Sequence, residues 1–509
     1  MRIRNRQVSG EVSIRTPPWN RATSRTRQLR RGSTYAGRRP KGRLRRGRVA
    51  IESTPVVAAE PAQPPGDRAT VASVSTNATA DHPRMRAMLV LVGTLTAAYV
   101  LWQLGFAQAR WTWRILALNG VSLGLAVAAF APYCWRIPLW LTYHPVPALQ
   151  VEDPRLPEIT VVIPAFNEGP TLFESIRSIL GSDYPAAKLR IIVVDDGSTD
   201  DTAQHAHRAA LLDPARVSVI AQPQNRGKRR ALYAGFAHVQ TPIFVTVDSD
   251  TVLPRESLRA LVTPLVCDAR IQAVAGRIDV LNRNDNLLTR MLAVQYRLAF
   301  DFIRAAQSQL GSVLVSPGAF SAYRMDAVRG ALDAWVGQRF LGAYCFNGDD
   351  HALTNVVLGQ GGLTVYQSNA PARTSVPRTF KRLALMYLRW SRSNIRESTL
   401  WMAFLPGLAR RRDRWPAMLD GVAHFIQLPA RIALAPVATL TFLLNPALLL
   451  SAIFSTIVAS GVYALMFLRS ERSYDAAYTG LYAVFSLLTL WWLYPVALLT
   501  VRQSRWLTR

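Results

Sequence analysis

The sequence has few cysteines and few acidic residues for its length. Its 509 residues include 3 cysteines, Cys134, Cys267 and Cys345. They are widely scattered and show no Cys-x-x-Cys spacing, which argues against a disulfide framework and a zinc site. The sequence contains 32 Asp and Glu but 60 Lys and Arg, so the formal net charge is +28. Anionic lipid and nucleic acid are therefore the first partners to weigh.

Much of this charge lies in an N-terminal tail that lacks large apolar residues at a regular spacing. Residues 1–50 hold 16 of the 60 Lys and Arg against one acid, Glu11. Residues 1–85 are rich in Arg, Pro, Ser, Thr and Ala, which predicts disorder. We expect no secretory signal, because the first apolar run begins only near Met88. A basic tail next to a membrane segment would be attracted to anionic lipid on the cytoplasmic side. This explains the charge of the tail without a nucleic-acid partner, so none is expected.

Two apolar segments follow the tail, within residues 86–143. Residues 87–106 contain no charged side chain over about the length needed to cross the ~30 Å hydrocarbon core. Residues 115–133 form a second apolar segment, flanked by tryptophans that are typical of a membrane interface. We expect both segments to be transmembrane helices. The positive-inside rule then places the tail and the region that follows them in the cytoplasm.

The chain becomes strongly apolar again over residues 416–503, which predicts three or four transmembrane helices. The predicted spans lie near residues 418–441, 445–468 and 477–501. Arg431 falls inside the first span and is a candidate contact for a pore or a headgroup, or a residue that extends to the interface. Residues 398–415 mix aromatic, leucine and basic residues, as an interfacial helix does.

Between the apolar blocks, residues 150–400 alternate short apolar runs with helical stretches of ~12 residues, which predicts βαβ units and a largely parallel sheet. The predicted strands are "ITVVIPAFNE", "LRIIVVDDGSTD", "RVSVIAQ" and "PIFVTVDSD". Three of them end in acidic or amide side chains, namely Asn167 and Glu168, Asp195 and Asp196, and Asp248 and Asp250. Because ligands bind at the carboxyl ends of strands in open α/β sheets, these side chains should meet at one crevice.

The usual phosphate-binding loops are missing from this region. It has no Walker-type loop and no Gly-x-Gly-x-x-Gly after the first strand, so the backbone offers no common cradle for a diphosphate. In "VDSD", Asp248 and Asp250 stand two positions apart, and an extended chain would place both carboxylates on one side. Such oxygen ligands suit Mg²⁺ or Mn²⁺ that carries phosphate oxygens.

Seven motifs over residues 159–397 stand in an order that resembles glycosyltransferase family 2. They are "PAFNE", "VVDDGSTDDT", "NRGKRRAL", "VDSDTVL", "SPGAFSAYR", "NGDDHALTN" and "YLRWSRSNIRES". The order is similar to that of the processive membrane synthases of hyaluronan, chitin, chitin oligosaccharides, cellulose and poly-N-acetylglucosamine, and closest to the hyaluronan and chitin-oligosaccharide branch. The resemblance implies an α/β fold, a cytoplasmic GT-A (Rossmann-like) domain embedded between N-terminal and C-terminal transmembrane helices.

The resemblance also implies site residues, taken position by position. Those implied to contact the UDP group are Phe166, Asn167, Glu168, Asp195, Asp196, Lys228, Arg229, Asp248 and Arg389. The implied metal ligand is Asp250, and the implied acceptor contacts are Ser316, Gly318 and Trp390, the first two in a loop beneath the acceptor sugar. A solvated helix face is the alternative for the Lys-Arg pair. An interfacial anchor is the alternative for the Arg-Trp pair.

Asp349 and Asp350 stand directly before a predicted helix, where aspartates commonly accept the free N–H groups of the first turn. The resemblance implies a further function, because the second acid of the family motif takes the proton of the acceptor hydroxyl. That position is Asp350, and Asp349 would orient it or cap the helix. His351 stands where the family often has Arg, and Met386 replaces the Gln of its Gln-x-x-Arg-Trp motif. The change to Met386 concerns product identity or processivity more than sugar transfer, and the change to His351 concerns whatever the family's Arg contacts.

The sequence thus predicts a membrane-embedded, inverting β-glycosyltransferase. It would move N-acetylglucosamine, alone or alternating with glucuronate, from a UDP-sugar to a growing polysaccharide with coupled export. One alternative is the transfer of a single sugar to a polyprenyl-phosphate or other lipid. Another is a nonenzymatic membrane protein whose Arg-rich tail binds nucleic acid or lipid. The expected partners are a UDP-sugar donor, a polysaccharide acceptor and the lipid bilayer, with Mg²⁺ or Mn²⁺ as cofactor; the oligomeric state is not predicted.

Overall fold

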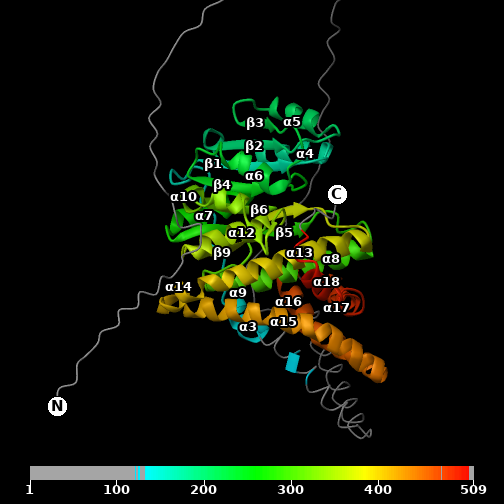
Figure 1. Cartoon of the computed structure of the whole chain (residues 1–509). Helices are drawn as coiled ribbons and strands as arrows, with labels where there is room; N and C mark the ends of the chain where they lie inside the picture. The colour runs from blue at the N-terminus through cyan, green and yellow to red at the C-terminus, as the bar shows by residue number, and fades with distance from the viewer. Residues whose placement is uncertain (1–120, 122–123, 126–131, 472, 504–509) are drawn as a thin grey trace, which may run out of the picture. The chain divides into compact units, whose positions relative to one another are not determined.

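The computed structural model describes residues 121, 124–125, 132–471 and 473–503 of the chain (Figure 1). The predicted disordered tail and the first predicted span, residues 87–106, lie outside the described residues, and so does most of the second predicted span.

The central element is a seven-stranded sheet with the strand order β3-β2-β1-β4-β6-β5-β9. Its strands are β1 (Ile159–Ala165), β2 (Leu189–Asp195), β3 (Val217–Ala221), β4 (Ile243–Val247), β5 (Ile271–Val280), β6 (Phe320–Arg324) and β9 (Leu363–Thr374). The four predicted strands, β1 to β4, are parallel, whereas β6 runs antiparallel to both β4 and β5. The sheet is therefore mixed rather than largely parallel, because an apolar run does not encode the direction of its strand.

Helices cover both faces of the sheet. The first layer contains α4 (Pro170–Leu180), α5 (Thr202–Ala210), α7 (Ser257–Cys267) and α8 (Leu287–Leu298). The second layer contains α6 (Lys228–Phe236), α10 (Met325–Arg329), α11 (Leu332–Val336) and α12 (Asp349–Gly359). This arrangement confirms the predicted α/β fold.

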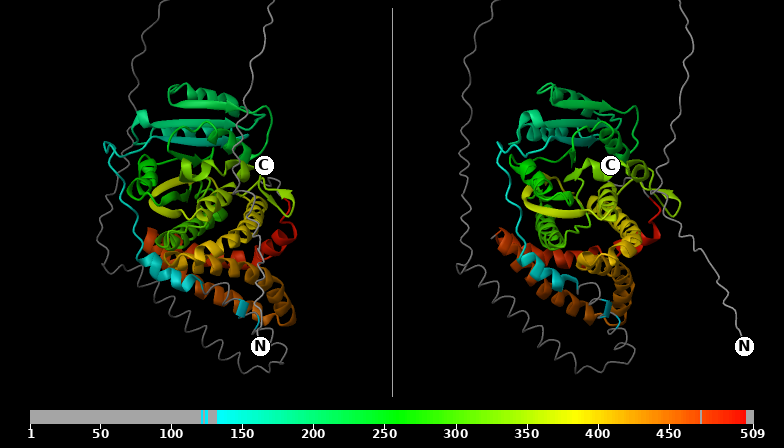
Figure 2. Two further views of the ribbon diagram at one scale, coloured as in Figure 1. Left: turned by 60° about the vertical axis from the view of Figure 1, so that its left-hand side comes forward. Right: turned by 90° about the vertical axis from the view of Figure 1, so that its left-hand side faces the viewer.

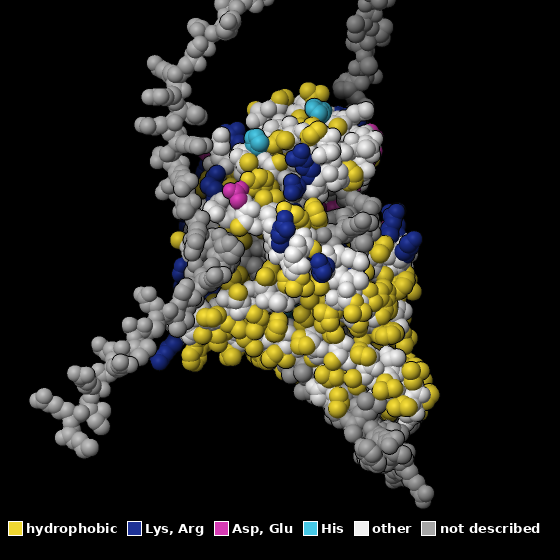
Figure 3. All heavy atoms as spheres, in the orientation of Figure 1, with side chains coloured by type: hydrophobic (Ala, Val, Ile, Leu, Met, Phe, Trp, Pro, Cys, Tyr) yellow, Lys and Arg dark blue, Asp and Glu magenta, His cyan; other side chains and the backbone are white. Residues whose placement is uncertain are grey.

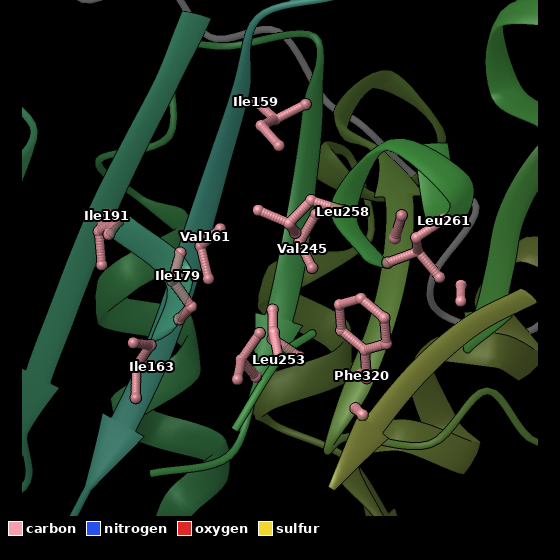
Figure 4. Packing of buried hydrophobic residues seen from close by; sticks show 14 of the residues in the cluster. Ile159, Val161, Ile163, Ile179, Ile191, Val245, Leu253, Leu258, Leu261 and Phe320 are labelled. Atoms are coloured by element: carbon pink, nitrogen blue, oxygen red, sulfur yellow. The ribbon is translucent and has the colours of Figure 1, made fainter. Parts of the chain in front are cut away.

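The alternation of side chains along β1 explains why its sequence is apolar except for Thr160. Val161 points into the first layer and packs in one cluster with Ile179 of α4 and Leu258 of α7 (Figure 4). Val162 points into the second layer and packs in another cluster with Phe236 of α6. Each fully buried side chain of this kind contributes about 1.5–3 kcal/mol. The strand ends that border the site are thus anchored by core packing on both faces.

The remaining described elements lie before, between and after the strands of the sheet. They are η2 (Ala186–Lys188), α3 (Pro132–Leu141), η3 (Ala299–Arg304), α9 (Ala305–Gln309), β7 (Arg339–Phe340), β8 (Ala343–Tyr344), α13 (Phe380–Trp401), η4 (Met402–Phe404), α14 (Leu405–Ala409), η5 (Arg412–Arg414), α15 (Trp415–Leu444), α16 (Ala447–Glu471), η6 (Tyr474–Ala477), α17 (Tyr478–Thr489) and α18 (Leu493–Leu499). Helices α15 to α18 lie together on the side of the sheet where β9 forms its edge (Figures 1 and 2).

Two of the described helical segments, Arg412–Leu444 and Ala447–Glu471, are long and apolar enough to cross a membrane. Hydrophobic side chains gather on the surface over these helices, whereas Lys and Arg lie mainly on the half of the described region that contains the sheet (Figure 3). The large apolar residues exposed there include Leu419, Ile426, Leu440, Leu443, Leu444, Leu450, Ile457, Val462, Leu481 and Leu488. A surface of this kind indicates membrane association.

One expectation about the C-terminal region needs correction, and one predicted span is bent. The predicted interfacial helix at residues 398–415 is not one helix, because α13 continues to Trp401 and the short helical segments η4, α14 and η5 follow. Pro406 at the start of α14 accounts for this break, since proline lacks the N–H that a continuous helix needs. The predicted span at 477–501 is bent by 46° between α17 and α18. Pro495, in the first turn of α18, has the same effect there.

One buried carboxylate joins three elements. Asp420 of α15 accepts hydrogen bonds from Arg136 of α3, from Nε at 2.8 Å and from Nη2 at 3.0 Å. It also accepts from Trp135 Nε1 at 3.1 Å and from Gln307 Nε2 of α9 at 3.2 Å. Arg136 and Asp420 are 1% and 2% exposed. Helices from before, within and after the sheet region are therefore tied at one point.

Candidate active site

A large cavity, with a volume of about 2840 Å³, lies at the carboxyl ends of β1, β2 and β4 and at the start of α12. Its charged lining includes Asp196, Lys228, Asp248, Asp250, Arg304, Asp349, Asp350, Arg389 and Arg431. Parallel strands end at the same edge of a sheet, and this brings acids from distant parts of the sequence together. The cavity therefore combines several carboxylates with several cations.

Lys228, the first residue of α6, lies between two of these acids. Its Nζ donates a hydrogen bond to Oδ1 of Asp248 at 2.5 Å and stands 3.9 Å from Oδ2 of Asp349. Burial alone would lower the pKa of Lys228, but the charges of Asp248 and Asp349 raise it above its ordinary value. Lys228 is therefore a permanent cation at the strand ends, which suits the binding of a diphosphate.

Asp250 lies in a turn that follows β4. The strand ends at Val247, and the N–H of Thr251 donates to the carbonyl of Asp248 at 3.0 Å. The expectation that an extended chain aligns Asp248 and Asp250 is therefore wrong. Oδ1 of Asp250 accepts a hydrogen bond from Oγ1 of Thr374 at 3.1 Å. Burial, together with the charge of Asp248, raises the pKa of Asp250 to about 6.

The acids suit a cation that arrives with a nucleotide. The described residues contain no group of three or more His, Cys, Asp or Glu side chains that could hold a metal ion. Mg²⁺ commonly uses one or two carboxylates together with phosphate oxygens and water, so such a group is not required. Lys228 pairs with Asp248, whereas Asp250 accepts its side-chain hydrogen bond from the neutral hydroxyl of Thr374. Asp250 thus fits the prediction of a divalent metal ligand.

The position of Asp350 depends on the turn that starts α12. Gly348 precedes the helix with a φ of +73°, and a Cβ there would lie 1.9 Å from Oγ of Ser393, so only glycine fits. The carboxylate of Asp350 accepts from the N–H of His351 at 2.8 Å and from the N–H of Gly318 at 3.3 Å. Burial and the charge of Asp349 raise the pKa of Asp350, which makes it a stronger proton acceptor.

Helix capping explains only part of the Asp-Asp pair. One oxygen of Asp350 does accept a free N–H of the first turn, that of His351. Asp349 instead faces Lys228, and the N-cap residue Gly348 makes no side-chain cap. The two carboxylates therefore contribute to the cavity as well as to the helix start.

Helix α13 brings Arg389 and Trp390 to the same cavity. Burial lowers the pKa of Arg389, while the charges of Asp349 and Asp248 act in the opposite sense. An arginine stays protonated under these conditions, so a second cation faces the acids. The implied nucleotide contact of Arg389 thus has a suitable location.

Aromatic rings surround the acceptor position implied for Trp390. Its ring centroid lies 5.5 Å from Tyr387 and 6.1 Å from Tyr296, and the side chain is 42% exposed. Met386 lines the cavity one turn earlier, and its Sδ accepts a hydrogen bond from the hydroxyl of Tyr296 at 3.9 Å. A thioether thus occupies the place where the family has an amide.

Several residues that the sequence predicts as ligand contacts do not line the cavity. Phe166, Asp196 and Gly318 do line it, whereas Asn167, Glu168, Asp195 and Ser316 do not. Oδ1 of Asn167 accepts from the N–H of Thr199 at 2.9 Å, and Oδ1 of Asp195 accepts from Oγ of Ser198 at 2.5 Å. These side chains fix the loops after β1 and β2. The predicted loop at residues 316–324 also differs, because its last five residues form β6.

Arg229 does not face the cavity either. Successive residues of an α-helix point about 100° apart, so Lys228 and Arg229 cannot both face the same space. The Arg229 side chain is 2% exposed, and its Nη2 donates to the carbonyl oxygens of Asn347 and Gly348. The predicted contact of Arg229 with the nucleotide is therefore not supported by its position.

One cation of the cavity has no signal in the sequence. Arg304 ends η3, a π-helical segment, and its guanidinium lies 3.7 Å from the ring centroid of Phe300. Burial lowers the pKa of Arg304 to about 9. π-Helical turns often occur at functional sites, but neither a spacing nor a motif marks this one. Arg431, which was a candidate from the sequence, also lines the cavity.

Comparison with known proteins identifies the class. The family model "Glycosyl transferase family 2" matches residues 160–331. An N-acetylglucosaminyltransferase of Rhizobium leguminosarum bv. viciae is 33% identical over 374 residues, 72% of this chain and 85% of that protein. A second, from Rhizobium sp. (strain N33), is 34% identical over 359 residues, 69% of this chain and 77% of that protein. The chain therefore belongs to glycosyltransferase family 2, as its motifs predict.

The protein is accordingly a glycosyltransferase, with a nucleotide-sugar donor and a saccharide acceptor. A solved structure, of the mannosyltransferase PcManGT from Pyrobaculum calidifontis with GDP-Man and Mn²⁺, aligns with a TM-score of 0.47 and 21% identity. The alignment covers 73% of this chain and 99% of that one.

Proposed function

We propose that the protein is an inverting β-glycosyltransferase that transfers N-acetylglucosamine from UDP-N-acetylglucosamine to a growing polysaccharide. The observation that carries the proposal is the extent of the cavity. It begins at Asp248 and Asp350 and continues without interruption to Thr439 of α15, Ser455 of α16 and Ser486 of α17. A cavity of about 2840 Å³ has room for several sugars and not only one. The names of the relatives support the choice of sugar.

The donor half of the cavity suits a UDP group. Phe166 offers an aromatic face for the uracil, and Asp196 offers a carboxylate whose oxygens accept from the N–H groups of Arg226 at 2.9 Å and Gly227 at 2.7 Å. Lys228 is positioned to neutralise phosphate oxygens, and Arg389 supplies a second positive charge. A divalent cation held by Asp250 would further stabilise the departing diphosphate.

The acceptor half supplies a base. The acceptor hydroxyl oxygen attacks C1 of the donor sugar, the bond from C1 to the diphosphate oxygen breaks, and the carboxylate of Asp350 takes the hydroxyl proton. The bond electrons leave with UDP. A single displacement without an enzyme-bound sugar inverts the configuration at C1. Trp390 is the residue that would stack on the terminal sugar of the acceptor.

The apolar helices suit processive synthesis with export. Polar side chains of the apolar helices, such as Thr439 and Ser455, line the cavity between α15, α16 and α17. We propose that the polymer leaves along this path through several membrane spans. The positive-inside rule supports a cytoplasmic location for the site and the tail.

A second candidate is the transfer of one sugar to a lipid acceptor. The same apolar helices that line the cavity, α15 to α17, would also contact a polyprenyl chain. The two functions differ in product size and in solubility.

Product analysis tests the proposal. The full chain in membranes is incubated with labelled UDP-N-acetylglucosamine, alone and with UDP-glucuronate. We expect a water-soluble product of many sugars, and a requirement for both donors would identify an alternating polymer. A short product that is extracted into organic solvent would support the lipid candidate. Absence of product with either donor would contradict the proposal.

Trp390→Ala is expected to impair polymer growth while it spares the hydrolysis of the UDP-sugar by water. Only the sugar acceptor needs a stacking platform, and an aromatic platform of this kind contributes about 0.5–1.5 kcal/mol beyond its buried area. One assay that follows both UDP release and polymer length measures the two effects. Trp415→Ala is the matched control, because Trp415 is 49% exposed and lies outside the cavity. Equal loss of both activities would instead assign Trp390 to membrane anchoring.

A further inference from the structure

Two buried arginines converge on the turn that precedes the two aspartates of α12. From α6, Nη2 of Arg229 donates hydrogen bonds to the carbonyl oxygens of Asn347 at 3.3 Å and Gly348 at 3.1 Å. From α13, Nη2 of Arg396 donates to the carbonyl oxygen of Asn347 at 2.5 Å and to its Oδ1 at 3.1 Å. Two helices that are far apart in the sequence therefore hold the same peptide carbonyl.

One carboxylate connects these arginines. Oε1 of Glu397 accepts from Nε of Arg396 at 3.0 Å, and Nε2 of Gln338 lies 3.1 Å from each oxygen of Glu397. Oε1 of Gln338 accepts from Nη1 of Arg229 at 2.6 Å. Asn355, two turns into α12, donates from Nδ2 to Oε2 of Glu397 at 3.3 Å. The hydrogen bonds thus form one network that links α6, α12 and α13.

The charged members of this network are almost fully buried. Arg229 is 2% exposed, and Arg396 and Glu397 are each 1% exposed. Buried ion clusters add little to stability, because desolvation of the charges offsets their attraction. A more specific effect of this network is geometric, since both arginines donate to the Asn347–Gly348 turn.

The network also reaches the first residue of α12. The indole N–H of Trp335 donates to the carbonyl oxygen of Asp349 at 3.1 Å, and the guanidinium of Arg229 lies 5.3 Å from the Trp335 ring centroid. The carbonyl oxygens of three successive residues, 347 to 349, are therefore fixed by side chains. Because Asp350 follows directly, the direction of its carboxylate depends on this turn.

We propose that Arg229, Arg396 and Glu397 are positioning residues, which hold the Asn347–Gly348 turn so that the carboxylate of Asp350 meets the acceptor hydroxyl. None of the three lines the described cavity, so they act through Asp350 and not on the substrates. The inference rests on the proposed function, because it takes Asp350 as the base. It also gives Arg229 a function other than the predicted nucleotide contact.

Arg229→Lys and Arg396→Lys test this inference in the full chain in lipid nanodiscs. Both variants keep the positive charge but lose the planar fork that makes several directed hydrogen bonds. Turnover of UDP-N-acetylglucosamine is expected to fall about 10- to 100-fold, because a displacement of ~1 Å at a reacting group can cost ~10²-fold. The affinity for UDP with Mn²⁺, measured by calorimetry, should change by less than about threefold, since the donor contacts lie on other residues.

The matched control is Arg255→Lys, the same substitution at an exposed ion pair with Asp183 outside the cavity. It should change neither turnover nor UDP affinity. If either network variant loses UDP affinity in proportion to its turnover, the residue supports the donor site or the fold as a whole. That result would overturn the positioning function.

A double-mutant cycle shows whether the network acts through the base. Combining Arg396→Lys with Asp350→Asn should lower turnover little beyond Asp350→Asn alone, because the network then has no base to position. Multiplied losses in the double variant would overturn the inference and leave the base assignment intact. An Asp350→Asn protein with full turnover would overturn the base assignment itself, so the two failures are distinguishable.

Discussion

An Asp350→Asn variant is expected to turn over about 10²- to 10⁴-fold more slowly than the unaltered protein, the range that a positioned acid-base group typically contributes. The amide is close in shape to the carboxylate but cannot accept the proton of the acceptor hydroxyl. Its UDP affinity should change by no more than about threefold, because Lys228, Asp250 and Arg389 are unaltered. Steady-state rates with UDP-N-acetylglucosamine and calorimetry with UDP measure the two quantities.

Asp326→Asn is the matched control for this experiment. Oδ1 of Asp326 accepts from the N–H of the next residue, Ala327, at 2.8 Å, which is the contact that Asp350 makes with His351. Asp326 is exposed and lies outside the cavity, so its variant should retain full turnover.

The acid limb of the pH profile of turnover gives a second test of Asp350. Turnover should fall as the pH decreases, because Asp350 becomes protonated and can no longer accept the hydroxyl proton. Since the pKa of Asp350 is raised, this fall should occur at a higher pH than for an aspartate of ordinary pKa. Full activity of Asp350→Asn would refute its assignment as the base.

Asp250→Ala is expected to abolish the part of UDP binding that depends on a divalent metal. Loss of an outer-shell partner typically costs 10–100-fold in metal affinity, so loss of a ligand itself should exceed about 100-fold. Calorimetry with UDP in the presence and absence of Mn²⁺ measures this difference. UDP binding without metal should persist, because Lys228 and Arg389 are unchanged.

Thr374→Val separates metal binding from a structural function of Asp250. This variant removes the hydroxyl that donates to Oδ1 of Asp250 at 3.1 Å but leaves the carboxylate in place. It should keep most of the metal-dependent affinity. If Asp250→Ala binds UDP with Mn²⁺ as tightly as the unaltered protein does, Asp250 only anchors the turn after β4.

Several features of the site could be predicted because they follow from local patterns. The runs at Ile159 and Ile243 are apolar except for one threonine each, as a strand buried on both faces favours. Asp196, after β2, and Asp248 and Asp250, after β4, reach one cavity because parallel strands share an edge. The start of α12 at Asp349 could likewise be recognised from the acidic residues that favour a helix start.

Other features depend on contacts between distant residues and could not be predicted from spacing. Arg229 follows a lysine in a motif that resembles a nucleotide site, yet its orientation on α6 directs it to the carbonyl of Asn347, 118 positions later. Arg304 lines the cavity because η3 is a π-helical segment, and the sequence carries no mark of one. The direction of β6 is set by its neighbours β4 and β5 rather than by its own residues.

The shared carboxylate of Asp420 has a consequence for the boundaries of the catalytic unit. A fragment cut at residues 150–400 would contain the complete sheet but neither α3 nor α15, and Gln307 would lose its acceptor. The same cut would remove Tyr143, whose hydroxyl donates to the carbonyl of Tyr366 at 2.8 Å in β9. The edge strand β9 is thus held in part by Tyr143, a residue outside the range 150–400. A fragment of residues 150–400 would therefore lose contacts that hold both α9 and β9 in the complete structure.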